Sequence, residues 1–168
     1  MLCRLAGEKD LPAVQAMFHE IVDHMNATGV CIWDEVYPCA FFAEDIANRE
    51  LYLLQNDDAL AAAFVLSPAC EGDSVIRWQD CGAKALYLRR FGVSAGLSRR
   101  GIGMQAVGEA ARIARESGAQ WLRLLVCEAN TPAMRLYEKA GFTRGGGSFD
   151  LDFYDGSSLH EYGYELKL

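Results

Sequence analysis

The stretch between Val93 and Ala106 combines residue types that could hold a phosphate group. An apolar, β-prone run from Ala85 to Val93 leads into it, two adjacent arginines precede Gly101-Ile102-Gly103, and a helical pattern follows without a break. Glycines let the backbone approach an anion closely, and the N–H groups of a helix N-terminus point toward it. Arginine side chains add charge-assisted hydrogen bonds. The stretch therefore predicts a phosphate-binding loop.

Two other phosphate-binding loops share parts of this pattern. Gly101-x-Gly103-x-x-Ala106 fits a loose dinucleotide fingerprint, in which the first glycine directly follows the strand and an acidic residue comes about 20 residues later. Here seven residues separate Val93 from Gly101, and the run from Trp121 to Cys127 ends without an acid at that distance. The chain also lacks the GxxxxGK(S/T) pattern of a P-loop ATPase. Both nucleotide-binding loops are therefore excluded.

A second segment, from Asn130 to Phe142, reads Asn-Thr-Pro-Ala-Met-Arg-Leu-Tyr-Glu-Lys-Ala-Gly-Phe. With the loop at 98–103, it resembles the two signature segments of the GNAT superfamily of N-acetyltransferases, and the chain is similar to small bacterial members. The family's later motif, N-x-x-A-x-x-L-Y-E-K-x-G-F, is matched completely. Its loop motif, Q/R-x-x-G-x-G/A, is matched except at Ser98. Because that motif works mainly through backbone N–H groups, we expect Ser98 to be tolerated.

The resemblance implies one GNAT domain over residues 1–168, with an α/β (α+β) fold. This fold is a twisted, mostly antiparallel mixed sheet of about seven strands, splayed between strands four and five, with about four helices. The resemblance also implies acetyl-CoA as co-substrate, with its pantetheine arm in the splayed gap and its pyrophosphate on the loop. The residues then expected to bind it are Phe91, Gly92, Val93, Ser98, Arg99, Arg100, Gly101, Ile102, Gly103, Met104, Asn130, Ala133 and Tyr137.

Amine attack on a thioester needs a neutral amine, a polarised carbonyl and protonation of the leaving thiolate. A backbone N–H exposed by a strand bulge near Phe91 to Val93 is expected to polarise the carbonyl. Tyr137 matches the motif tyrosine of the family and is predicted to be the general acid. The alternative is a core tyrosine packed beside Ala133 and Leu136. Asn130 is predicted both to cap its helix and to contact the cofactor.

No spacing singles out the general base. Glu35, in the loop that the family uses to close the acceptor site, is predicted for this role, and a chain of water molecules is an alternative. Trp33, Glu35 and Tyr37 are expected to line the acceptor pocket. Arg89 and Arg90 are adjacent on a strand and face opposite sides, so at most one can enter that pocket. Other groups that remain open as bases are Asp34, Glu128, Asp152, Asp155, His160 and Tyr162.

Hydrophobic periodicity and end signals indicate the elements that position these residues. Helices are predicted over 10–26, 38–49, 101–117 and 131–140. Strands are predicted over 2–6, 51–55, 59–67, 84–93, 121–127, 142–153 and 159–168. The remaining long segment, 68–83, is predicted to be irregular and to pack through Val75, Ile76 and Trp78.

The charge distribution divides the chain, whose net charge is −7. Residues 84–144 carry eleven Lys and Arg against four Asp and Glu, whereas residues 1–83 and 145–168 are acidic. A basic middle suits a polyanionic small molecule, and acidic flanks favour a cationic partner, although an ordinary solvated surface is the alternative. An acidic chain without a basic stripe makes nucleic acid a poor partner.

The six cysteines form no CxxC pair and no secretory leader is evident, which predicts reduced thiols in the cytoplasm. The apolar run 59–66 is too short to span a bilayer, so no membrane role is expected. His19, Glu20 and His24 miss the HExxH spacing by one position, so no metal is expected. The family resemblance admits a homodimer.

The sequence therefore predicts an acetyl-CoA-dependent N-acetyltransferase that acts on a primary amine of a small molecule or peptide, by direct attack in a ternary complex. The acidic flanks favour a cationic amine such as a polyamine, aminoglycoside, amino acid or peptide N-terminus. One alternative is a catalytically silent CoA-binding or ligand-sensing module on the same fold, against which Tyr137 argues. Another is an acyltransferase that uses a longer acyl chain or an oxygen acceptor.

Overall fold

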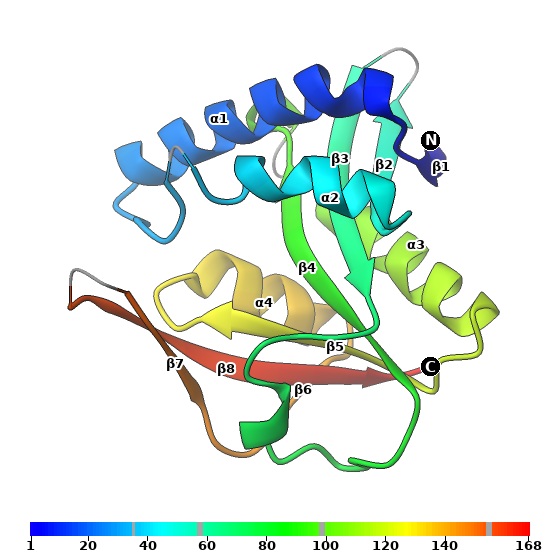
Figure 1. Ribbon diagram of the computed structural model, residues 1–168, viewed down its shortest axis with the longest axis vertical. Helices are drawn as coiled ribbons and strands as arrows, with labels where there is room; N and C mark the ends of the chain where they lie inside the picture. Colours follow the sequence, from blue (N-terminus) through cyan, green and yellow to red (C-terminus); the bar gives the residue numbers. More distant parts are fainter. Residues whose placement is uncertain (35, 57–58, 98–99, 154–155) are drawn as a thin grey trace. The chain divides into compact units, whose positions relative to one another are not determined.

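The computed structural model describes residues 1–34, 36–56, 59–97, 100–153 and 156–168. These residues form eight β-strands and four α-helices, labelled in Figure 1. They fall into two compact units. The first unit comprises residues 1–66 and 89–109, and the second comprises residues 67–88 and 110–168. The prediction of a single domain stays a prediction.

The first unit contains an antiparallel set of strands. β1 (Leu2–Leu5) pairs with β2 (Leu51–Asn56), and β2 pairs with β3 (Ala59–Ser67). β4 (Ala85–Val93) is the next strand in the sheet after β3, and its last five residues belong to this unit. Residues 61–66 of β3 are buried without alternation, as in a strand that is covered on both faces.

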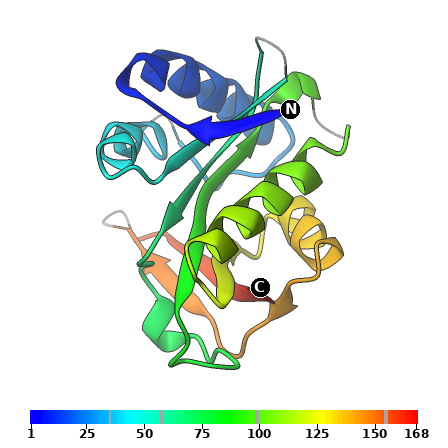
Figure 2. The same ribbon diagram turned by 90° about the vertical axis from the view of Figure 1, so that its right-hand side faces the viewer.

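Helices α1 (Leu11–Ala27) and α2 (Phe42–Ala47) lie on one side of β2 and β3, as Figures 1 and 2 show. Pro12 fits the first turn of α1 because the N–H groups there have no partner within the helix. The helices and strands share one apolar core, made of Val14, Met17, Phe18, Ile21, Cys39, Phe42, Ile46, Leu51, Leu53, Ala63 and Val65. Cys39 belongs to this core and Trp33 packs against it, so the core holds the connection between α1 and α2 in place.

The second unit is built around β8 (Ser158–Lys167). β8 pairs antiparallel with β5 (Trp121–Cys127), β6 (Thr143–Arg144) and β7 (Phe149–Asp152). Residues 85–87 of β4 pair parallel with 121–123 of β5. The sheet is therefore mixed and mostly antiparallel, and this fold class is confirmed.

Helices α3 (Ile102–Glu116) and α4 (Thr131–Lys139) confirm two predicted helices to within one residue at each end. Gly118 and Gly141 follow them with φ of +77° and +93°, which is the left-handed conformation common after a helix. The predicted helix over 38–49 is shorter. A 3₁₀ turn, Cys39–Phe41, precedes α2, which ends at Ala47.

The prediction of one strand over 142–153 was wrong. β6 and β7 are separated by three glycines, of which Gly147 has φ +83°. Gly146 instead forms an isolated bridge with Arg77, with N···O distances of 2.8 and 3.0 Å. Because glycine readily adopts positive φ, the chain turns here, and the described residues form eight strands rather than about seven.

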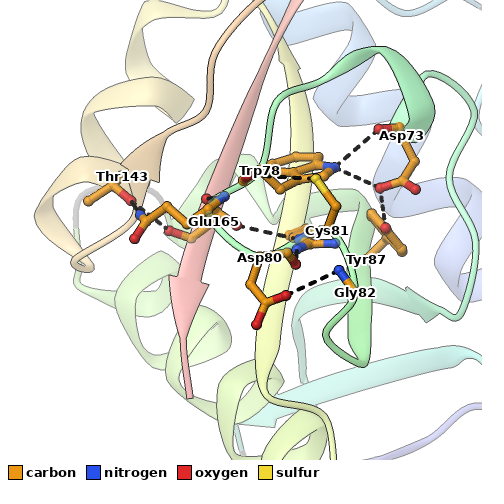
Figure 3. Close-up of polar contacts among 10 residues, drawn as sticks. Asp73, Trp78, Asp80, Cys81, Gly82, Tyr87, Thr143 and Glu165 are labelled. Carbon is orange, nitrogen blue, oxygen red and sulfur yellow. Dashed lines mark hydrogen bonds and ion pairs between the residues drawn. The ribbon is translucent and has the colours of Figure 1, made fainter.

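Segment 68–84 is anchored to the sheet of the second unit by the polar contacts drawn in Figure 3. Trp78 Nε1 donates to the Asp73 carboxylate at 2.8 Å, and the Tyr87 hydroxyl donates to the same oxygen. The Arg123 guanidinium lies 4.8 Å from the centre of a Trp78 ring, and Glu165 accepts from the Gln79 N–H at 2.8 Å. These contacts seat the segment on β5 and β8.

Packing in segment 68–84 follows the prediction at two of three positions. Ile76 and Trp78 are buried, whereas Val75 is 53% exposed. The prediction that Val75 is packed was wrong, and Val75 lies at the end of a 3₁₀ turn over Asp73–Val75. Gly163 of β8 makes room for the buried pair, because a Cβ there would lie 2.6 Å from Ile76 and 2.7 Å from Trp78. Across the described ranges, no helix is both long enough and apolar enough to cross a membrane.

Candidate functional site

The predicted phosphate loop contains a glycine that its backbone conformation requires. Gly101 has φ +78°, and a Cβ at this position would meet nothing within 4 Å. Conformation rather than crowding therefore selects glycine. The Gly101 carbonyl accepts from the Gln105 N–H at 3.1 Å and so begins α3. The N–H groups of the first turn have no acceptor within the helix, and such N–H groups at a helix N-terminus can bind an anion.

The other described loop residues lie just before the first turn of α3 or within it. Arg100 is exposed, Gly103 and Met104 are half-buried, and Ile102 is buried and anchors the first turn. Ser98 and Arg99, which were expected to contribute to the loop, lie outside the described residues. The described part of the loop thus offers one arginine and the backbone of residues 101–104.

β4 ends beside α1, and Gly92 is the point of closest approach. A Cβ on Gly92 would lie 2.6 Å from Phe18 Cζ and 2.9 Å from Ile21 Cδ1. The neighbouring Phe91 and Val93 are half-buried. The sequence suggested Gly92 as a cofactor contact, but the structure gives this glycine a packing role, which sequence reasoning missed because the facing residue lies more than 70 positions away.

Arg90 interrupts the regular conformation of β4 just before residues 91–93, near which a bulge was expected. Its φ is +45°, which is uncommon for a residue with a side chain. Its guanidinium forms two hydrogen bonds with Asp45 of α2, Nε to Oδ2 at 2.8 Å and Nη2 to Oδ1 at 2.6 Å. Burial lowers the pKa of Arg90, but the bonds to Asp45 outweigh it, so the net pKa is raised and the charge is kept. Nothing in the sequence pattern singled out Asp45.

The loop between α1 and α2 brings Trp33 and Tyr37 together. Their ring centres lie 6.3 Å apart, and Trp33 also packs 5.6 Å from Phe18 of the core. Asp34 Oδ1 accepts from the Val36 and Tyr37 N–H groups at 2.8 and 2.6 Å, so this carboxylate shapes the turn. Glu35, predicted as the general base, lies outside the described residues.

In the second unit, α4 positions the predicted general acid. Asn130 Oδ1 accepts from the Ala133 N–H at 3.3 Å and caps the helix, as its sequence predicted. Tyr137 is 6% exposed, and its ring centre is 5.7 Å from that of Phe142. Burial raises the pKa of the Tyr137 phenol above its ordinary value. The hydroxyl therefore keeps its proton at neutral pH, as a proton donor must.

Other potential bases in the second unit are engaged in side-chain pairs. Glu128 Oε2 accepts from the Tyr162 hydroxyl at 2.9 Å, and His160 Nδ1 lies 2.5 Å from Asp150 Oδ1. Asp152 is exposed on β7, and Asp155 lies outside the described residues. No described contact selects one of these groups as the base.

The described residues contain no group of three or more His, Cys, Asp or Glu side chains that could hold a metal ion. His19 and His24 both lie on the exposed face of α1. The half-match to a zinc-protease pattern is therefore a surface feature of this helix.

The arrangement of these elements along the chain agrees with a known family. A family model described as "Acetyltransferase (GNAT) family" matches residues 18–142. The chain belongs to the GNAT acetyltransferase family. This GNAT acetyltransferase is also similar to "Putative phosphinothricin acetyltransferase YwnH" of Bacillus subtilis. The two are 25% identical over 171 residues, which cover 100% of this chain and 96% of that relative.

Solved structures share the fold. A GNAT acetyltransferase of Streptococcus agalactiae superposes with a TM-score of 0.84 at 18% identity, over 99% of this chain and 95% of that one. The protein yncA of Salmonella typhimurium, described as "a putative acetyltransferase" and solved with its cofactor acetyl-CoA, gives a TM-score of 0.72 at 15% identity, over 100% of this chain and 94% of that one. At such identities the likeness shows the fold, and a neighbour of that fold holds acetyl-CoA.

Proposed function

We propose that this GNAT acetyltransferase is an N-acetyltransferase that transfers the acetyl group of acetyl-CoA to a primary amine of a small molecule or peptide. The observation that carries the proposal is Tyr137, which is buried on a capped helix within a complete copy of the family motif. The match of Tyr137 to the tyrosine of the family motif argues against a silent CoA-binding module. Family membership and the acetyl-CoA bound by a structural neighbour support the donor.

The residues proposed to bind acetyl-CoA form two sets. In the first unit, the backbone N–H groups of 101–104, with Ser98, Arg99 and Arg100, bind the pyrophosphate, and Phe91, Gly92 and Val93 bind the pantetheine arm through their backbone. Among the described residues outside its chain neighbours, nothing lies within 4 Å of where a Cβ on Gly101 would stand, which leaves the start of α3 accessible. In the second unit, Asn130, Ala133 and Tyr137 are the proposed contacts.

The proposed transfer moves two protons. The amine nitrogen forms a bond to the acetyl carbonyl carbon while the bond from that carbon to sulfur breaks. The amine loses a proton to a base, for which Glu35 is proposed, and the departing thiolate takes the phenolic proton of Tyr137. Proton return from solvent then restores Tyr137. A backbone N–H of residues 91–93, beside the irregular backbone at Arg90, is the proposed donor to the carbonyl oxygen.

Trp33, Glu35 and Tyr37 are the proposed walls of the acceptor site. The contact between the rings of Trp33 and Tyr37 supports an aromatic surface there. The acceptor class stays open between cationic amines, which the acidic flanks favour, and amino-acid-like amines. Phosphinothricin appears in the name of the Bacillus subtilis relative, so it joins a polyamine, an aminoglycoside and a peptide N-terminus in the amine panel that tests this proposal.

Thiol release from acetyl-CoA across that panel tests the reaction. Replacement of the acid in Tyr137→Phe is expected to lower kcat by roughly 10²- to 10⁴-fold. Tyr164→Phe is the matched control, because Tyr164 is also a buried tyrosine of the second unit and its hydroxyl bonds Glu138 at 3.0 Å. Full turnover in Tyr137→Phe would show that another group is the acid. A rise in melting temperature with acetyl-CoA, but no thiol release with any amine, would favour the silent module.

We also propose a cytoplasmic setting, since the six cysteines form no CxxC pair and are expected to stay reduced. A homodimer is proposed on the family resemblance alone. Sedimentation of the purified chain over a range of concentrations tests the dimer, which is expected to appear as a species of twice the 18.5 kDa chain mass.

A further inference from the structure

A buried ion pair in the first unit has no part in the transfer steps proposed above. Arg90 and Asp45 hold each other through two parallel hydrogen bonds, at 2.6 and 2.8 Å. Their side chains are only 5% and 4% exposed. A buried ion pair contributes little net stability compared with apolar residues of similar volume, but its fixed fork geometry imposes one orientation on the groups it joins.

The Arg90 guanidinium also contacts the loop proposed to line the acceptor site. Its central carbon lies 5.1 Å from the ring centre of Phe41 and 6.0 Å from that of Tyr37, both within the range of cation–π attraction. The two rings are 5.6 Å apart at 65°, and Tyr37 in turn contacts Trp33. One guanidinium therefore contacts the last two rings of an aromatic row whose first ring lies in the apolar core. The row consists of Phe18, Trp33, Tyr37 and Phe41.

The backbone of Arg90 adds a second constraint at the same residue. Its positive φ is a costly conformation for a residue with a side chain, and such conformations persist only where the surroundings impose them. The ion pair holds Arg90 in this conformation, since Asp45 of α2 fixes its side chain. The residues that follow, 91–93, are the stretch proposed to donate to the acetyl carbonyl.

We infer that Arg90, oriented by Asp45, is a positioning residue that holds the rings of Phe41 and Tyr37, and through them Trp33, in the arrangement that admits the amine acceptor. The inference rests on the proposed function and deepens it. Asp45 pairs with the charge of Arg90, and the guanidinium lies beside the rings of Tyr37 and Phe41, so the role needs no direct contact with either substrate. Lysine cannot replace it, because an ammonium group has neither the fork nor the flat face.

Steady-state kinetics separate this role from a purely structural one. Arg90→Lys is expected to raise the KM of the amine about tenfold, while the Kd of acetyl-CoA stays within about twofold. Asp45→Asn is expected to raise the KM of the amine in the same way, although the Arg90 residue itself is kept. The control is Arg4→Lys, because Arg4 and Asp10 of the same unit also form a two-bond pair, at 2.7 and 2.8 Å, in a more exposed position between β1 and the start of α1.

Equal changes in amine KM for Arg90→Lys and Arg4→Lys, or no change in either, would overturn the inference. If Arg90→Lys does not fold, Phe41→Leu removes one ring of the row and leaves the buried pair intact, because Phe41 is 42% exposed. The same rise in amine KM is expected for it, and an unchanged KM would count against the role of the loop.

A spectroscopic measurement keeps the inference testable if no amine is turned over, which would be a failure of the proposed function alone. In ¹⁵N-labelled protein, the indole N–H resonance of Trp33, assigned with Trp33→Phe, reports the placement of the loop. It is expected to shift in Arg90→Lys and to stay unchanged in Arg4→Lys. A Trp33 resonance that is unaffected by Arg90→Lys would show that the pair does not position the loop.

Discussion

Replacement of Gly92 by alanine distinguishes a packing role from a ligand-binding role for this glycine. The new Cβ would lie 2.6 and 2.8 Å from two ring carbons of Phe18 and 2.9 Å from Ile21 Cδ1. All three separations are below 3.0 Å, which Cβ atoms essentially never show. Gly92 does not have a positive φ, so crowding alone opposes the substitution.

The Phe18 ring has little freedom to yield. It is fully buried, packs edge-on against Phe42 at 4.7 Å and lies 5.6 Å from Trp33. Overpacking of a well-filled core costs about 1–3 kcal/mol, and this site belongs at the upper end of that range. Alanine offsets about 0.4–1 kcal/mol of this cost, because it lowers the conformational entropy of the unfolded chain. The expected loss in the free energy of unfolding is therefore about 2 kcal/mol.

Urea unfolding without acetyl-CoA measures this loss. The matched control is Gly108→Ala, which lies within α3, where a Cβ meets nothing within 4 Å. It is expected to stabilise the protein by about 0.5–1 kcal/mol, since alanine favours the helix. Unchanged stability of Gly92→Ala without ligand, together with weaker acetyl-CoA binding, would refute the packing argument and return Gly92 to the cofactor site alone.

Three further results are expected. Arg4 holds the pKa of Asp10 at about 2, below its ordinary 3.8, so the stabilisation from this pair is present above pH 4 and is lost as the pH falls toward 2. The unfolding free energies of wild type and Asp10→Asn should therefore converge over that interval. A difference that stays constant with pH would contradict this role of the pair. Gly101→Ala places a side chain at φ +78° and should lower stability by about 1–2 kcal/mol while raising the Kd of acetyl-CoA, measured by calorimetry. Asn130→Ala removes the cap of α4 and should cost about 0.5–2 kcal/mol in urea unfolding, whereas Asn130→Asp should retain most of it.

Local chemistry made much of the fold readable from the sequence. The helices at α1, α3 and α4 follow from apolar spacing between recognisable ends, because Pro12 fits a first turn and Gly118 and Gly141 fit helix stops. The strand over 142–153 was misjudged because the chain breaks at residues 145–147, where Gly146 bridges to Arg77 of a distant segment. A bridge between distant segments leaves no local periodicity to detect.

The sequence by itself determined the family, the donor expected for it and the helix that carries Tyr137, because these depend on short motifs in which neighbouring residues act together. Only the tertiary structure paired Arg90 with Asp45, seated the guanidinium on Tyr37 and Phe41, and crowded Gly92 against Phe18. These contacts join residues that are distant along the chain. Their energies depend on distances and burial that arise only when α1, α2 and β4 pack, so spacing in the sequence carries no record of them.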